Sequence, residues 1–463
     1  MRAWVWAVLV AATFAAPRSE AASSEVAAVC AACVQANMER LAGDELRGRK
    51  CGSADEAAAA DYIVAQLKTS KVSGALTGGG YVQPVELHTP SYAATPTATL
   101  SSGTETRRLV EGQDMIATDA PPMLDAPILR VTDAKAAAGS AAGKLVIFDT
   151  PAFDAGGMAT LLDGGAAAVL MPAPQRMLDA WSAAGGVSAR RAPGPTDVVG
   201  TPPPLAGHKI PAIFVKPETL ERLRGLDGGA AHLDFQRGPE LVRMTHNVIG
   251  VIHGSAADAD RHAVLLSAHY DHLGVRGGVI FHGANDDASG TAAVLEFARI
   301  LGHGRPPRRT VYFALFGCEE EGELGSAYFQ YHPVTPITDL AVNLEFEMIG
   351  VNDPGQPGFL MMTGWERSNL GEALKSHGAR IQPDPYPKED FFRRSDNFQL
   401  ARKGVVAHTI TAWPLPPTYH RATDDLAHID LAFMDQVIGS LVQPVTWLLN
   451  SDFQPAWKPG MQP

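Results

Sequence analysis

The sequence has few cysteines, no excess of basic residues and no long hydrophobic run beyond its first residues. Four cysteines in 463 residues are too few for a disulfide scaffold, so the fold must rest on a hydrophobic core. The formal charge of -12 argues against a nucleic-acid partner, which requires a basic surface. Because no run approaches the length of a transmembrane helix, no stable membrane insertion is expected. Apolar residues make up 46% of the chain, which excludes a disordered or fibrous protein.

The N-terminus has the organisation of a secretory signal. A basic start at Arg2 precedes an apolar run over residues 3–16, and small residues follow around Ala21. This order predicts a signal peptide over residues 1–21 and a secreted or periplasmic protein. The alternative is that the same segment is retained as an anchor.

Export places the cysteines in an oxidising compartment. Cys30, Cys33 and Cys51 lie within a short stretch. Cys30 and Cys33 have the spacing of a redox or zinc pair, but no second such pair follows, and we expect instead one disulfide that joins Cys30 or Cys33 to Cys51. Cys318 would then remain as a small buried residue in an apolar strand.

Three segments follow the signal peptide and differ in their pattern of apolar and turn-forming residues. The flanking segments, residues 22–96 and 241–463, carry helix-spaced apolar residues and near-continuous apolar strands, whereas residues 97–240 contain short β-like runs between turns rich in Ala, Gly and Pro. Near-continuous strands that alternate with helices predict an α/β fold whose sheet is mixed, mostly parallel and covered by helices on both faces. The middle segment is predicted to be an inserted, β-rich domain.

Residues of the types that commonly bind metals follow each predicted strand. Four strands are expected over residues 262–268, 310–316, 341–346 and 405–411, and ligands bind beyond the carboxyl ends of such strands. The residues found there or in the turn before the next helix are His269, Asp271, Asp286, Glu319, Glu320, Glu347, Tyr419 and His420. Imidazole and carboxylate together suit zinc, and one carboxylate can bridge two ions.

These motifs resemble those of the di-zinc exopeptidases, which include secreted bacterial leucyl aminopeptidases and glutamate carboxypeptidase. The similar segments are residues 267–272 (SAHYDH), 283–290 (GANDDASG), 319–326 (EEEGELGS), 343–350, and Tyr419-His420 with Asp424. Residues 45–49 (ELRGR) are similar to a segment near the start of the family's domain. The resemblance implies the zinc exopeptidase fold, two Zn²⁺ ions and peptide substrates.

The resemblance also implies a role for each residue. Asp286 would bridge the two zinc ions, His269 and Glu347 would complete one site, and Glu320 and His420 would complete the other. Glu319 would act as general base, Asp271 would orient the ring of His269, and Tyr419 would either donate to the oxyanion or pack beside His420. The peptide bond between Asp286 and Asp287 is expected to be cis.

The sequence departs from the family pattern at two places, and three histidines near the site need an interpretation. Glu347 stands where Asp is usual, and Glu345 lies on the same strand face, so that either residue can be the ligand, with Glu347 favoured by its register. Asn397 replaces a family His and receives no role. His272 is interpreted as a lining or structural residue, as are His282 and His408.

Residues 143–148 and 161–170 of the insertion resemble a protease-associated domain, whose expected work is to restrict or orient substrates. Together these features predict a secreted zinc aminopeptidase that removes N-terminal residues from peptides. A carboxypeptidase or dipeptidase, a single-zinc glutaminyl cyclase and a catalytically dead binding protein are the alternatives on the same fold. The sequence gives no indication of the oligomeric state.

Overall fold

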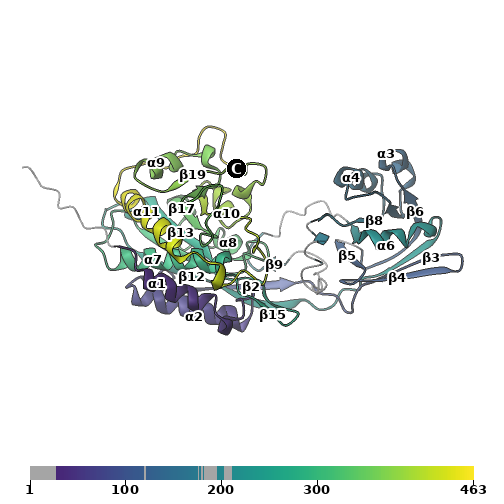
Figure 1. Ribbon diagram of the computed structural model, residues 1–463, viewed down its shortest axis with the longest axis horizontal. Coiled ribbons are helices and arrows are strands. Elements are labelled where there is room, and N and C mark those ends of the chain that lie inside the picture. Colours follow the sequence, from purple (N-terminus) through teal and green to yellow (C-terminus); the bar gives the residue numbers. More distant parts are fainter. Residues whose placement is uncertain (1–27, 119–120, 176, 179–180, 182–195, 203–210) are drawn as a thin grey trace, which may run out of the picture.

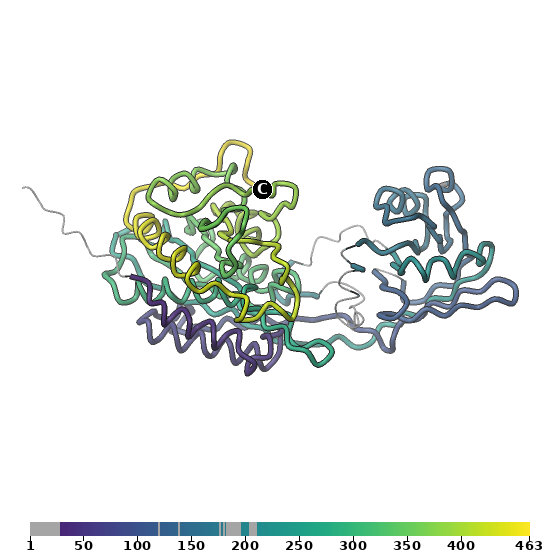
Figure 2. Tube along the Cα trace, viewed as in Figure 1, coloured from purple at the N-terminus to yellow at the C-terminus, as the bar shows by residue number. Residues whose placement is uncertain are grey.

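The structure is a computed structural model that describes residues 28–463 except 119–120, 176, 179–180, 182–195 and 203–210. The predicted signal peptide therefore lies outside the described residues. The chain forms two bodies that stand side by side, each built around its own sheet (Figures 1 and 2). No helix among the described residues has both the length and the apolar character required to cross a bilayer.

The main sheet has ten strands and is mixed. Its centre, β16, β13, β17 and β20, is parallel, and antiparallel strands extend it on both sides. In order across the sheet the strands are β19 (Ile381–Pro383), β18 (Leu360–Met362), β20 (Val406–Thr411), β17 (Leu340–Phe346), β13 (Ala263–His269), β16 (Val311–Phe316), β12 (Leu241–Ile252), β2 (Val82–Thr89) and β9 (Asp197–Val198), and β1 (Ser73–Gly74) pairs with β12.

Helices cover both faces of this sheet, as the apolar strands predict. In β13, Val264 and Leu266 contact one hydrophobic cluster, whereas Leu265 contacts another on the opposite face. A strand buried on both faces needs apolar residues at nearly every position. The helices are α1 (Ala31–Leu41), α2 (Ala54–Thr69), α7 (Gly290–Gly302), α8 (Leu324–Phe329), α9 (Leu370–Ser376), α10 (Asn397–Ala401) and α11 (Leu431–Asn450).

The second body contains an eight-stranded sheet with its own two clusters of buried apolar residues. Across the sheet lie β4 (Glu105–Val110), β3 (Thr97–Ser102), β11 (Ala230–Asp234), β6 (Met123–Val131), β7 (Leu145–Phe148), β8 (Ala168–Pro172), β10 (Ala212–Val215) and β5 (Met115–Thr118), and the helices α3 (Ala134–Ala137), α4 (Ala155–Asp163) and α6 (Pro217–Glu221) accompany them. The segments that enter and leave this body pair with each other, since Ala93 N donates to Gln236 O and Gly238 N donates to Ser91 O.

One stretch within residues 97–240 belongs to the main sheet. Strand β9 pairs with β2, and the carbonyl of Gly200 lies 2.7 Å from Nε2 of His332, just after α8. The inserted segment therefore returns to the first body before it completes its own sheet. A separate two-stranded hairpin, β14 (Gly274–Arg276) and β15 (Val279–Phe281), projects from the first body (Figure 1).

The expected disulfide pairing is wrong. Cys30 pairs with Cys33 within the first turn of α1, and Cys51 pairs with Cys318. The Cα atoms of Cys51 and Cys318 lie 4.8 Å apart because the turn before α2 packs against the end of β16. Proximity in sequence suggested a partner for Cys51 in α1, but the sheet brings a cysteine from 267 residues away closer.

Candidate active site

The strand ends of the main sheet place the predicted site residues together. His269 is the last residue of β13, Glu319 and Glu320 follow β16, and Glu347 follows β17. Asp286 lies in a tight turn, Ala284–Ser289, that leads into α7, and its peptide bond to Asp287 is cis, as predicted. The parallel centre of the sheet accounts for this convergence, because its strands all end at one edge.

Two groups of side chains can each hold a metal ion, and they share Asp286. Ligand atoms of His269, Asp286 and Glu347 lie within 4.8 Å of one another, and so do those of His272, Asp286 and Glu320. Nε2 of His269 is 3.2 Å from Oδ1 of Asp286. The two oxygens of Asp286 therefore face two different groups.

His420 approaches the second group from a loop. Its Nε2 lies 3.2 Å from Oδ2 of Asp286 and 3.1 Å from Oε2 of Glu320. Nδ1 of His272 lies 2.6 Å from Oε1 of the same Glu320. This group therefore contains two imidazoles, whereas the sequence predicted only His420 there.

The unpaired atoms of these residues fit a cation. Within the described chain, both ring nitrogens of His269 and of His272 and Oε1 of Glu320 are buried and make no aligned hydrogen bond, although Nδ1 of His272 and Oε1 of Glu320 lie only 2.6 Å apart. A buried polar atom without a partner costs about 1–3 kcal/mol. A divalent ion would satisfy the nitrogens and carboxylates together, and imidazole with carboxylate is the donor set that suits zinc.

The carboxylates and imidazoles of the site shift one another's pKa values in opposite directions. Burial alone would raise the pKa of Asp286, but the imidazoles of His269 and His420 hold it well below its usual range. For Glu320, burial and Asp286 act upward, yet His272 and His420 lower its pKa to about 2. In His420, burial acts downward, whereas Glu320 and Asp286 raise its pKa to about 10. The site thus holds ionised carboxylates against imidazoles in a buried space.

Glu319 and Asp271 lie next to the first group. Oε2 of Glu319 is 3.9 Å from Nε2 of His269, and its side chain keeps 14% exposure, so water can reach it. Asp271 accepts the backbone N–H of Glu319 at 2.9 Å and lies 3.6 Å from Nδ1 of His269. Burial raises the pKa of Glu319 well above its usual range. Asp271 thus contacts both the loop that carries Glu319 and the ring of His269.

Asp424 and Arg49 form hydrogen bonds to the turn that carries Asp286 and to the residues next to it. The carboxylate of Asp424 accepts the backbone N–H groups of Asn285 at 2.8 Å and of Asp286 at 3.1 Å. The guanidinium of Arg49 is fully buried and donates to the carbonyls of Tyr270 at 2.6 Å and Gly283 at 2.9 Å. Arg49 thus supports the chain between His269 and His272 and at Gly283, directly before the turn that carries Asp286.

Gly283 is required where it stands. Its φ of 60° lies in the left-handed region, and a Cβ there would lie 2.4 Å from Cγ of His272 and 2.3 Å from the carbonyl oxygen of Asp286. Any side chain would therefore displace the site.

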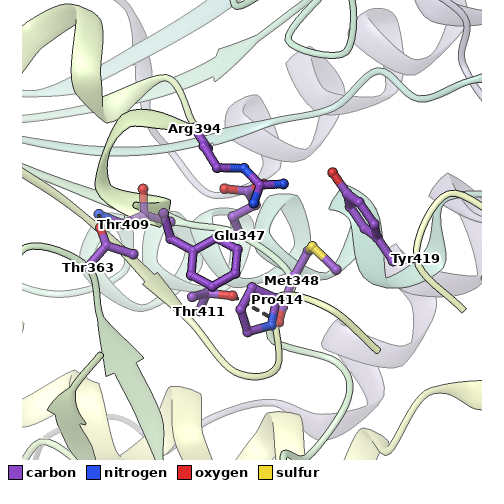
Figure 3. Close-up of a pocket in the computed structure, with 9 residues that line it drawn as sticks. Glu347, Met348, Thr363, Arg394, Thr409, Thr411, Pro414 and Tyr419 are labelled. Atoms are coloured by element: carbon purple, nitrogen blue, oxygen red, sulfur yellow. Dashed lines mark hydrogen bonds between the residues drawn. The ribbon is translucent and has the colours of Figure 1, made fainter. Parts of the chain in front are cut away.

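A small pocket opens beside Glu347 (Figure 3). Its walls include Thr409 and Thr411 of β20, and Arg394 and Tyr419 from loops. The ring of Tyr419 stacks on His420, with centroids 3.9 Å apart. Tyr419 therefore packs against the histidine, one of the two roles considered from the sequence, and also lines the pocket.

The structure bears on three further residues, of which His272 stands differently from its interpretation in the sequence. His272, taken as a lining residue, contacts Glu320 directly. Glu345 is fully buried with neither carboxylate oxygen bonded within the described chain, but Glu347, not Glu345, lies in the group with His269. Arg394 was not considered. The signal for His272 was available, since it lies three residues after His269 in the same strand-end segment.

The match to a known protein family covers the part of the chain that carries the candidate site. Residues 247–443 match the model of Peptidase family M28. Among curated proteins, the aminopeptidase YwaD of Bacillus subtilis is 28% identical in an alignment of 255 residues that covers 52% of each chain. The probable lipoprotein aminopeptidase LpqL of Mycobacterium tuberculosis is 26% identical over 48% of this chain and 49% of its own. The rat aminopeptidase NAALADL1 is 40% identical over 43% of this chain and 30% of its own. The chain thus spans about half or less of the length of the curated relatives it matches.

Solved structures extend the likeness in fold to nearly the whole chain. An aminopeptidase from Aneurinibacillus sp. strain AM-1 superposes with a TM-score of 0.61 at 20% identity, over 94% of this chain and 96% of its own. The zinc aminopeptidase BSAP from Bacillus subtilis gives 0.58 at 21% identity, over 92% and 97%. The sheet, the motifs at its strand ends and the family match agree with one another. Residues 247–443 of this chain are similar to peptidase family M28, in agreement with the resemblance of its motifs to the zinc exopeptidases.

Proposed function

We propose that this protein is an exported aminopeptidase that binds two zinc ions and hydrolyses the N-terminal peptide bond of peptides. The observation that carries the proposal is the pair of residue groups that share Asp286, with their buried nitrogens unpaired. His269 and Glu347 would complete one zinc site. Glu320 and His420 would complete the other, with His272 against Glu320.

The proposed chemistry divides between the ligands and the residues beside them. Bound zinc would supply a water of lowered pKa and would polarise the scissile carbonyl. Glu319 would accept the proton of the attacking water and deliver it to the leaving amine. Asp271 would hold both the ring of His269 and the backbone of Glu319, and Tyr419 would donate to the developing oxyanion.

The second body and the disulfides bear on where and on what the protein acts. Two disulfides among the described residues are typical of an oxidising compartment and support export. The inserted body is proposed to be a protease-associated domain that restricts access of substrates. The paired segments at its base and the return of β9 to the main sheet would hold it near the site.

The three consecutive glutamates provide the test. Glu319→Gln should keep two zinc ions per chain and lower kcat on an aminoacyl p-nitroanilide by about 10²–10⁴-fold, because only the proton acceptor is lost. Glu321→Gln is the matched control: Glu321 pairs with Arg243 at 2.6 Å on the surface, and its removal should leave turnover unchanged. Elemental analysis and steady-state kinetics are the measurements.

Each alternative has its own outcome in these assays. Unchanged turnover in Glu319→Gln would contradict its role as base, and loss of zinc would make it a ligand. Hydrolysis of N-acetylated peptides but not of free amino termini would indicate a carboxypeptidase. One zinc per chain with cyclisation of glutaminyl peptides would indicate a glutaminyl cyclase, and zinc binding without any hydrolysis would indicate a binding protein.

A further inference from the structure

The pocket beside Glu347 is mostly neutral, with one cationic group in its wall (Figure 3). Threonine hydroxyls and the Tyr419 hydroxyl supply neutral polar atoms. Glu347, the acidic residue of the wall, also belongs to the group with His269 and Asp286. Its charge is therefore committed to the metal site, and Arg394 is the charged side chain left for a substrate.

Arg394 is held in place without being neutralised. Its guanidinium lies 4.9 Å from the centroid of the Phe391 ring, a cation–π contact that favours this position of the side chain. The nearest carboxylate is Glu389, at 3.9 Å, and both side chains are more than 40% exposed. An exposed pair at this distance contributes little. Within the described chain no hydrogen bond of this guanidinium is found, so its N–H groups remain available.

The neighbouring arginine shows that this arrangement is specific to Arg394. Arg393 is more exposed, at 56%, pairs with Asp390 at 3.5 Å and lies over the ring of Phe398. It does not line the pocket. Two adjacent residues of the same type therefore differ in a single respect that matters here, which is access to the space beside the candidate metal ligands.

We propose that Arg394 binds a carboxylate of the substrate, so that peptides with a negative charge next to the scissile bond are preferred over neutral isosteres. The inference rests on the proposed peptidase function and names its substrate class. A guanidinium binds a carboxylate through two parallel N–H···O bonds. That carboxylate can come from an acidic side chain at the N-terminal residue or from the free C-terminus of a dipeptide.

Two pairs of matched substrates distinguish these sources. Glutamyl and glutaminyl p-nitroanilide differ only in the side-chain charge, and Leu-Ala and Leu-Ala amide differ only in the terminal charge. For one of the pairs, Arg394→Gln should lower the ratio of kcat/KM for the charged over the neutral member by about 10- to 100-fold. Arg394→Lys should retain part of that preference, and Arg393→Gln should leave both ratios as in the wild type.

A binding measurement makes the test independent of turnover. Titration of free L-glutamate and L-glutamine into the zinc-loaded protein by calorimetry should show weaker binding of glutamate in Arg394→Gln than in the wild type. A preference of the wild type for glutamate over glutamine would identify the side-chain carboxylate as the group bound, and equal affinity for the two would identify the α-carboxylate. Thermal unfolding monitors whether the variants remain folded. Unchanged ratios for both pairs together with unchanged glutamate binding would overturn the proposal. A wild type that binds glutamate through Arg394 but hydrolyses nothing would overturn the peptidase function instead.

Discussion

Both sheets of the molecule place a buried aspartate after a parallel strand, and the two aspartates have opposite surroundings. Asp149 follows β7 in the second body, where Arg130 and Arg224 donate to the same carboxylate oxygen. Burial acts to raise the pKa of Asp149, but the two arginines lower it below its usual value. Asp271 follows β13, where burial raises its pKa and the nearest cationic group is the imidazole of His269.

The difference shows what turns a strand-end acid into part of a site. Arginine is permanently charged and satisfies a carboxylate with fixed donors, which leaves Asp149 as a structural residue. In the first body the acids face imidazoles and other acids, so ring nitrogens and carboxylate oxygens remain unpaired. Both aspartates follow a strand. They differ in the side chain that faces the carboxylate, which is arginine for Asp149 and histidine for Asp271.

The largest expected effect compares the shared acid of the site with Asp149. Asp286→Asn should lower zinc affinity by more than about 100-fold and abolish hydrolysis. Removal of a residue that only orients a ligand lowers metal affinity by about 10- to 100-fold. Asp286 belongs to both groups of candidate ligands, so its replacement should lower the affinity further. Asp149→Asn should keep the full zinc content. Competition with a chromogenic chelator measures both. If Asp286→Asn retained two tightly bound ions, the proposed sharing of this carboxylate would be wrong.

The sequence was sufficient for those parts of the molecule that rest on local patterns. Strands such as β13 and β16 are buried on both faces and therefore read as continuous apolar runs, and their ends carry the residues that meet in the site. His269, Asp286 and Glu347 could be grouped because each follows or precedes a recognisable element. The cis bond at Asp286 came from the family resemblance, not from local propensity.

The parts that were missed depend on contacts between distant segments. The partner of Cys51 is 267 residues away, and no local pattern records that distance. Arg394 lies in a loop before α10, and its place in the pocket is set by the packing of Phe391. His272 was weighed by its residue type alone, whereas its role depends on the turn at Gly283, which fits closely against its ring.

A smaller effect is expected for Asp424, which shares features of both aspartates. Like Asp149 its carboxylate is bonded, but its donors are the backbone N–H groups of the turn that carries Asp286. Asp424→Asn should therefore lower zinc affinity by about 10- to 100-fold. Asp425→Asn is the matched control, because among the described residues Asp425 bonds only to the nearby Ala427 and His428 and is 35% exposed. Equal zinc affinity in both variants would mean that the turn holds its shape without Asp424.

The smallest effect is expected from Asp149 and concerns stability alone. Its arginine partners are 31% and 54% exposed, so solvent screening limits the ion pairs to about 1 kcal/mol of unfolding free energy. Because the folded-state pKa is lowered, this stabilisation is fully present above the unfolded pKa of about 3.9 and is lost as the pH falls through the lower folded value.

Asp149→Asn should accordingly lower the midpoint of thermal unfolding of the second body at pH 7, and the difference from the wild type should shrink as the pH falls below 4. Asp125→Asn, at a side chain 79% exposed, is the control and should shift the midpoint less. Hydrolysis of an aminoacyl p-nitroanilide at 25 °C should be the same in all three proteins, since Asp149 has no part in the site. A difference between Asp149→Asn and the wild type that stays constant down to pH 2 would show that the arginines do not stabilise the charged form, and the contrast between the two aspartates would then rest on packing alone.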